Sequence, residues 1–185
     1  MYNEILSIHD FKVDFLKLNL HRYILTFDDA LFSQYFYWNK IREIKTKKVL
    51  SVCTNLIGSG PPRSQFNKVP IEFPNTFNCL SLFRKNENRD NYMRLSEIKK
   101  IQNDIVIAAH GHNHIYEYAG SLKNKIDLLR SDTEKMLEWF LKNLQIIPTI
   151  YTFPHYSEFD MMRLILESYG FEEFIGPRKE IEELL

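Results

Sequence analysis

Apolar residues occur in short runs along the 185-residue chain, and each run ends at a polar or charged residue. Four runs are rich in β-branched and aromatic residues, as buried parallel strands are, and they cover residues 22–27, 48–53, 104–109 and 146–153. A shorter apolar run ends at His9 and is a candidate for a further strand. The pattern therefore predicts strands that end abruptly in polar groups.

Helical spacing of apolar residues separates these runs. It predicts helices over residues 30–45 and 95–101, one that begins with a capping box at Ser131 and Glu134, and one from Ser157 to Gly170. Residues 171–185 are expected to form a short strand and the start of a helix. Residues 58–91 show no clear periodicity and predict a long loop or insertion.

Strands that alternate with helices predict an α/β fold with a mainly parallel sheet, either open or closed as a (β/α) barrel. The length suits a single domain over residues 1–185, with the insertion at 58–91. Phe66, Phe73 and Phe77 in that insertion could stack on a sugar face or pack a small core of their own.

The composition of the chain argues against several classes of function and partner. Twenty-four basic and twenty-four acidic residues give a net charge of zero, so no basic field attracts nucleic acid. No apolar run reaches the roughly 20 residues that a membrane-spanning helix needs, and the polar N-terminus does not read as a signal peptide. Cys53 and Cys79 lack metal or redox spacing and are expected to be buried free thiols. We expect a soluble, cytoplasmic protein.

Chemically useful side chains follow three of the predicted strands. These are Asp28-Asp29, the run from His110 to His114, and His155. The carboxyl ends of parallel strands share one edge of a sheet, so these groups can meet in one cleft. Two imidazoles and a carboxylate bind a divalent ion and leave positions open for water, and a second carboxylate supplies a base. Taken singly, an Asp pair is more typical of a helix N-terminus, and a lone His of a structural hydrogen bond.

The residues resemble the polysaccharide deacetylases, metal-dependent carbohydrate esterases. Thr26-Phe27-Asp28-Asp29 is similar to the T/S-F-D-D motif of that family, and His110-Gly-His-Asn-His114 resembles its H-x-x-x-H motif. Tyr151-Thr-Phe-Pro-His155 looks like the third motif. The resemblance spans about residues 5–175 and implies a distorted (β/α) barrel.

The resemblance also implies roles for individual residues. Asp28 would be the catalytic base, and Asp29, His110 and His114 would hold the metal. The backbone N–H of His155, just after Pro154, would share the oxyanion charge, with Pro154 and Tyr156 against the substrate and His112 beside the ligands. Zinc is the first expectation for the metal, and cobalt, nickel and iron fit the same ligands.

The chain departs from the family pattern in two places. Thr152 stands where the third motif often has an Arg that orients the base, and no His follows His155 to protonate the leaving amine. His155 and His9 are the two substitutes for this general acid, beside the alternative that neither acts. The length is also short for a full barrel, which leaves open an incomplete barrel and closure by a partner copy in a homo-oligomer.

The function expected from the resemblance is removal of an N-acetyl or O-acetyl group from a sugar or glycan precursor, in surface-polysaccharide or glycoconjugate synthesis. One alternative is a catalytically impaired relative that binds metal and sugar or acts as a scaffold. Another is a metal hydrolase that cleaves a non-sugar amide.

Overall fold

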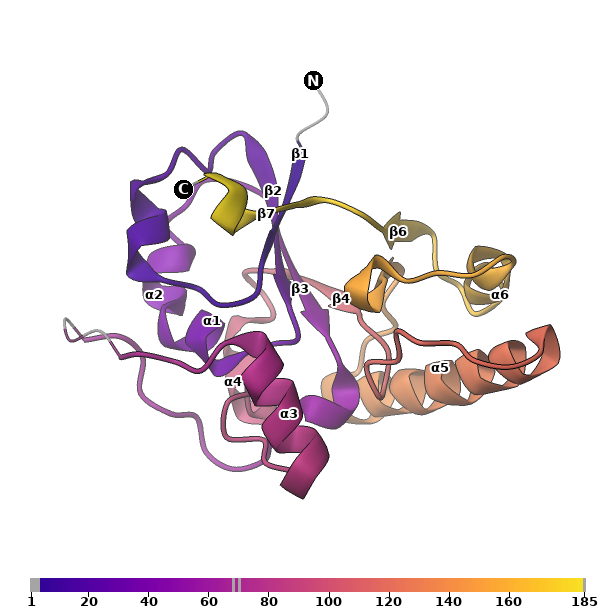
Figure 1. The fold of residues 1–185 in the computed structure, drawn as a ribbon. Coiled ribbons are helices and arrows are strands. Elements are labelled where there is room, and N and C mark those ends of the chain that lie inside the picture. Colours follow the sequence, from indigo (N-terminus) through magenta and orange to yellow (C-terminus); the bar gives the residue numbers. More distant parts are fainter. Residues whose placement is uncertain (1–3, 68, 70, 185) are drawn as a thin grey trace. The chain divides into compact units, whose positions relative to one another are not determined.

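The computed structural model describes residues 4–67, 69 and 71–184. Its internal contacts divide the chain into two compact units. The first unit holds residues 1–50, 56–106 and 178–185, and the second holds residues 51–55 and 107–177. The C-terminal residues therefore return to the unit in which the chain begins (Figure 1).

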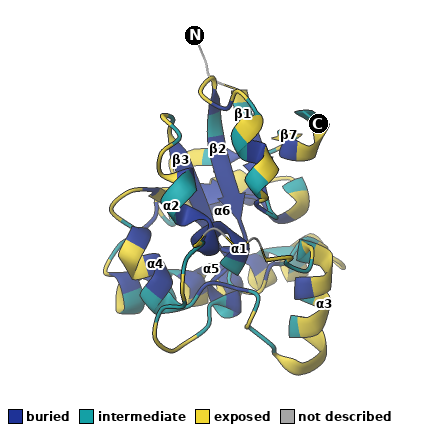
Figure 2. Cartoon of the chain, turned by 90° about the vertical axis from the view of Figure 1, so that its left-hand side faces the viewer, coloured by how far each residue is buried: buried dark blue, intermediate teal, exposed yellow. Residues whose placement is uncertain are grey.

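Three parallel strands organise the first unit: β1 (Glu4–Ile8), β2 (Tyr23–Asp28) and β7 (Lys179–Glu180). β1 is the further strand that the N-terminal apolar run suggested. Ile8 at the end of β1 pairs with Phe27 in β2, so His9 and Asp28 follow at the same edge. The buried side chains of these two strands form the middle of this unit (Figure 2), and they include Leu6, Ile8, Tyr23, Leu25 and Phe27.

The helices of the first unit are η1 (Val13–Lys17), α1 (Phe32–Phe36), α2 (Trp38–Ile41), α3 (Thr76–Asn86), α4 (Leu95–Ile101) and η4 (Ile181–Leu184). The single helix predicted over residues 30–45 is wrong, because the chain forms two short helices that meet at Tyr37. The carbonyl of Phe36 accepts a hydrogen bond from the N–H of Phe66 at 2.6 Å. The Phe36 carbonyl is therefore hydrogen-bonded to the insertion, and not to a residue further along a continuous helix.

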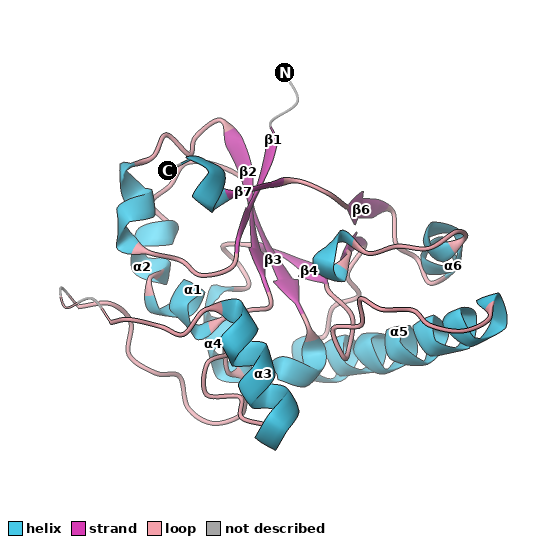
Figure 3. Cartoon of the chain, viewed as in Figure 1, coloured by secondary structure: helices cyan, strands magenta, loops and turns pink. Residues whose placement is uncertain are grey.

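The predicted loop 58–91 contains the helix α3, whereas the sequence pattern indicated none (Figure 3). Asn75 caps it by accepting from the N–H of Asn78 at 2.9 Å. Cys79 is the buried residue of this helix, so α3 has no apolar stripe that periodicity could detect. Positions 68 and 70 of the predicted loop lie outside the described residues.

The packing of the aromatic residues in the insertion distinguishes between the two roles expected for them, stacking on a sugar face and forming a small core. Phe73 packs 5.3 Å from Phe36, and Phe66 packs 5.2 Å from Tyr37, measured between ring centroids. Phe77, by contrast, is 68 % exposed. Two of the three rings therefore belong to a small core against α1 and α2.

The second unit contains strands β4 (Val106–Ala109), β5 (Ile150–Thr152) and β6 (Glu173–Ile175), which pair in parallel. Its helices are η2 (Thr54–Leu56), α5 (Leu122–Leu144), η3 (Pro154–Tyr156) and α6 (Met162–Ser168). Among the described residues, seven strands share one sheet in the order β6-β5-β4-β3-β2-β1-β7. β3 (Lys48–Val52) passes from the first unit into the second.

Two predicted helix starts in the second unit are wrong. Ser131 lies inside α5, and the cap is Ser121, whose hydroxyl accepts from the N–H of Asn124 at 3.3 Å. The first turns of α5 are largely exposed, but Leu122, Ile126 and Leu129 stand at helical spacing, so the apolar periodicity begins well before Ser131. Ser157 does not cap α6 but donates to the carbonyl of Tyr116 at 2.5 Å.

The C-terminal residues, the cysteines and the helix lengths bear on the remaining expectations. The closing residues form β6, β7 and the 3-10 helix η4, where one strand and a helix start were predicted. Cys53 and Cys79 are buried free thiols, as expected. In the part of the chain that is described, no helix has both the length and the apolar character required to cross a bilayer.

Candidate metal and acid–base site

Asp28 ends β2 and is almost completely buried. Its neighbours in the first unit include Ser7, Gln34 and Arg178. The Ser7 hydroxyl lies 3.5 Å from its Oδ2, and the guanidinium of Arg178 donates to the same oxygen. Gln34 joins the ends of β1 and β2 by donating to the carbonyls of Asp28 at 2.8 Å and His9 at 2.9 Å. Asp28 is thus a charged group held in a fixed orientation.

Arg178 is a residue that sequence reasoning missed. It lies just before β7, and its side chain is only 2 % exposed, as is that of Asp28. Its Nε also donates to the Thr26 hydroxyl at 3.0 Å. The third motif lacks an Arg at Thr152, but an Arg from the C-terminal segment pairs with Asp28. A lone Pro177-Arg178 in a charged tail gave no signal for this role.

His9 follows β1 and faces Asp28 and Glu180. Its Nε2 lies 3.7 Å from Asp28 Oδ2, and its Nδ1 lies 3.3 Å from Glu180 Oε2. Burial by itself lowers the pKa of His9. The hydrogen bond to Glu180 and the negative charges of Asp28 and Asp29 raise the pKa by more than burial lowers it, so that it is about 9. His9 therefore carries a proton at neutral pH.

Asp29 is buried and adopts a left-handed backbone, with φ of 64°. Its Oδ2 accepts a hydrogen bond from the Thr76 hydroxyl at 3.1 Å. Thr76 is the first residue of α3, so the insertion that looked featureless in the sequence supplies a group that orients this carboxylate.

His110 and His114 lie in the second unit, in the loop after β4, and both are buried. His110 Nδ1 lies 2.8 Å from the carbonyl of Thr152. A carbonyl can only accept, so Nδ1 carries the proton and Nε2 keeps the lone pair that a metal needs. The two imidazole centroids are 5.0 Å apart.

Asp132 on α5 shapes the loop between these histidines and was also missed from sequence. Its carboxylate accepts from the N–H of His112 at 2.7 Å and of Asn113 at 3.0 Å. Gly111 makes the turn with φ of 78°, and a Cβ there would lie 3.1 Å from Asp132. Glycine at position 111 therefore leaves room for the buried Asp132 carboxylate, which stabilises the turn.

His112 points to a different neighbour, because its Nδ1 lies 2.8 Å from the Thr54 hydroxyl. Burial lowers its pKa. His155 is exposed, and its ring packs 4.5 Å from Tyr116 and 5.3 Å from His114, between centroids. Pro154 before it is buried. Tyr116 is thus a further aromatic neighbour that no motif indicated.

Backbone strain is concentrated at the residues singled out from the sequence. Of the eight non-glycine residues with positive φ in the described part of the chain, four are site candidates: Asp29, His114, His155 and Tyr156. Such conformations cost about 1–3 kcal/mol each and persist where the surroundings enforce them, often at functional sites.

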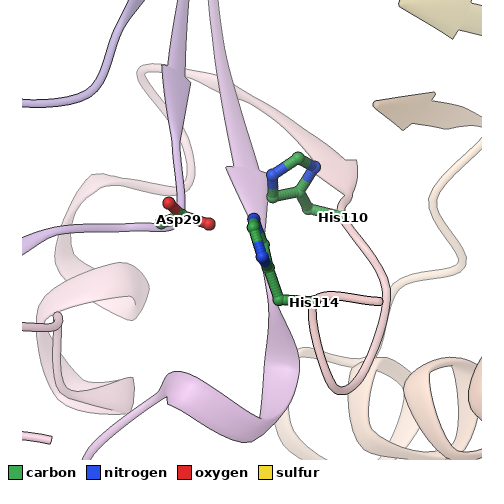
Figure 4. A group of neighbouring side chains, drawn as sticks. All are labelled: Asp29, His110 and His114. Atoms are coloured by element: carbon green, nitrogen blue, oxygen red, sulfur yellow. The ribbon is translucent and has the colours of Figure 1, made fainter. Parts of the chain in front are cut away.

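The donor set fits a divalent transition metal. Asp29, His110 and His114 each offer one ligand atom and are all buried (Figure 4). Two imidazoles with one carboxylate suit zinc, cobalt, nickel or iron. Hydrogen bonds from Thr76 to Asp29 and from His110 to Thr152 fix two of the three ligands.

Comparisons with known proteins report on the fold. No family model matches the sequence, and no curated protein matches it either. Solved structures do: IcaB from Ammonifex degensii has a TM-score of 0.62 at 15% identity over 86% of this chain and 61% of that one. The BpsB deacetylase domain from Bordetella bronchiseptica has a TM-score of 0.62 at 12% identity over 84% and 63%.

A de-N-acetylase from Aggregatibacter actinomycetemcomitans is also similar, with a TM-score of 0.61 at 12% identity over 94% of this chain and 72% of that one. The chain spans a little over three fifths of the length of the first two structures. At these identities the likeness is one of fold. The chain therefore has the fold of solved polysaccharide deacetylase structures, and the predicted α/β class with an incomplete (β/α) barrel is confirmed.

Proposed function

We propose that this protein is a metal-dependent deacetylase that removes an acetyl group, first of all an N-acetyl group, from a sugar. One observation carries the proposal. Asp29 directly after β2, and His110 and His114 in the loop after β4, are buried and each offers one ligand atom, which together make the donor set of a catalytic metal site. The carboxylate next in sequence to Asp29 belongs to Asp28, which supplies a base. A role in surface-polysaccharide or glycoconjugate synthesis is part of the proposal.

Each group has a task in acyl transfer. Asp29, His110 and His114 would hold a divalent ion, which would supply a Lewis acid for the acetyl carbonyl and the attacking water. Asp28 accepts the proton of the attacking water, and Arg178 holds the Asp28 carboxylate in place. The N–H of His155 donates to the carbonyl oxygen as negative charge develops there.

We assign the leaving-group proton to His9. It lies 3.7 Å from Asp28, beside the base, and its pKa of about 9 keeps the proton available at neutral pH. An amide nitrogen needs that proton because an amine anion is a very poor leaving group. With His9 in this role, the reaction needs no His after residue 155.

Acetate release tests the function directly. We expect protein stripped by a chelator to release no acetate from N-acetylated amino sugars, and zinc reloading to restore release. Metal that binds stoichiometrically without any acetate release would favour the non-catalytic, sugar-binding alternative. Acetate release by fully stripped protein would contradict metal dependence.

A leaving-group comparison tests His9. We expect His9→Gln to lower kcat on an N-acetyl sugar by about 10²-fold or more, because a general acid contributes about 10²–10⁴-fold. An aryl acetate ester leaves without protonation, so its hydrolysis should change little. The wild-type rate on the amide should fall as pH rises above about 9, where His9 loses its proton.

His155→Gln is the matched control. We expect this variant to affect amide and ester alike, because its side chain donates no proton in this scheme. A selective loss on the amide in His155→Gln, with none in His9→Gln, would transfer the role of general acid to His155.

A further inference from the structure

Gln34 is a buried amide that takes no part in the proton transfers proposed for Asp28 and His9. It lies in α1 and is 1 % exposed. Its Nε2 donates to the carbonyl of Asp28 at 2.8 Å and to that of His9 at 2.9 Å, and it lies 3.3 Å from the carbonyl of Ile8. All of these residues belong to the first unit. One side chain therefore binds the backbone of both residues to which we assign proton transfer.

The carbonyls of His9 and Asp28 lie just beyond the paired part of two strands. The last paired residues of β1 and β2 are Ile8 and Phe27, so His9 and Asp28 come one position later. Buried backbone carbonyls beyond such a ladder need another hydrogen-bond partner. Gln34 supplies one partner to both strands, and this fixes the two strand ends relative to each other.

The hydrogen bond from Gln34 to Asp28 also spans the turn after β2. Asp29 and Ala30 in this turn both have positive φ, 64° and 52°, before α1 begins at Phe32. Left-handed residues other than glycine are strained, at about 1–3 kcal/mol each, and persist where the surroundings enforce them. The Gln34 amide is one of the groups that enforce this turn.

The oxygen of the same amide argues against a role in packing alone. Gln34 Oε1 is buried and has no hydrogen-bond partner within the described ranges of the chain. A buried acceptor without a partner costs about 1–3 kcal/mol, and an apolar side chain of the same length would avoid that cost. The chain therefore has an amide at a position where its donors are used and its acceptor is not.

We propose that Gln34 is a positioning residue that holds the general acid His9 in place beside the base Asp28. This inference rests on the proposed function. Asp28 is held by Ser7 and Arg178 as well. His9 follows the last paired residue of β1, and its ring contacts Asp28 from a backbone position that Gln34 fixes. Loss of the amide should therefore displace His9 more than Asp28.

Gln34→Met tests the inference, because Met keeps the length and unbranched shape of Gln but has no donor. We expect kcat of the zinc-loaded variant on an N-acetyl sugar to fall about 10–100-fold, since a displacement of about 1 Å can cost about 100-fold. KM, zinc content and hydrolysis of an aryl acetate ester should change little. Gln34→Asn, whose amide is one methylene shorter, should show a smaller loss of the same kind, and it replaces Gln34→Met if that variant does not fold.

A double variant separates positioning from a general loss of structure. In the His9→Gln background, Gln34→Met should lower the amide rate no further, because the group that Gln34 positions is already absent. Gln102→Met is the matched control. Gln102 ends α4, and its Oε1 is likewise buried without a partner in the part of the chain that is described. This control should keep the wild-type ratio of amide to ester rates. Losses that multiply in the double variant, or equal losses on amide and ester, would overturn the inference.

The pKa of His9, followed by NMR, tests the same inference without any activity. It should fall from about 9 in wild type toward 6.5 in Gln34→Met, because the ring moves away from Glu180 and Asp28. A pKa that stays at the wild-type value in the folded variant would show that Gln34 does not position His9. If no substrate releases acetate, the proposed function fails, and the pKa still decides whether Gln34 positions His9.

Discussion

Protein that carries Asp29→Ala is expected to purify without stoichiometric zinc, and to release acetate more than about 100-fold more slowly than wild type. Removing a partner outside the ligand shell already costs about 10–100-fold in affinity or activity, so removing a ligand should cost more. His110→Ala and His114→Ala should behave in the same way. Elemental analysis and acetate release, measured on the same samples, check this.

Variants at other positions should lose zinc binding to different degrees. Thr76→Val removes the hydroxyl that donates to Asp29 at 3.1 Å and should weaken zinc binding by about tenfold rather than abolish it. Asp14→Ala and His21→Ala change exposed residues of the same types and should bind zinc like wild type. Wild-type zinc content in Asp29→Ala would show that the ion binds elsewhere.

The parts of the site that the sequence predicted share a cause. Asp28, His110 and His155 follow apolar runs that had to be buried strands, and the ends of parallel strands fix where such residues go. His9 became a candidate for the same reason, because an apolar run precedes it. The local sequence pattern and the topology of a parallel sheet together were enough to place these residues at strand ends.

The missed residues act through contacts that no local pattern encodes. Arg178 is 150 positions from Asp28, and Asp132 is 20 positions from His112, inside α5. Thr76 starts a helix whose exposed faces resemble a loop in the sequence. Such partners depend on how distant segments pack, and a single sequence does not show that.

The second prediction with a large expected effect concerns Asp28, the proposed catalytic base. We expect Asp28→Asn to bind zinc like wild type and to lose about 10²–10⁴-fold in kcat, because the amide keeps the shape of the carboxylate but cannot accept the proton of water. The same change should cost about 3–5 kcal/mol of the free energy of unfolding, because it leaves the buried Arg178 charge without its counter-ion. Urea unfolding and acetate release, corrected for the folded fraction, measure the two effects.

Arg178→Met separates catalysis from stability. It breaks the same ion pair and should destabilise the protein by a similar amount, yet it keeps the Asp28 carboxylate and should lose less activity than Asp28→Asn. The double variant, Asp28→Asn with Arg178→Met, removes both buried charges and should regain stability without regaining activity. If the double variant recovered kcat along with stability, the loss in Asp28→Asn would be a folding effect, and Asp28 would not be the base.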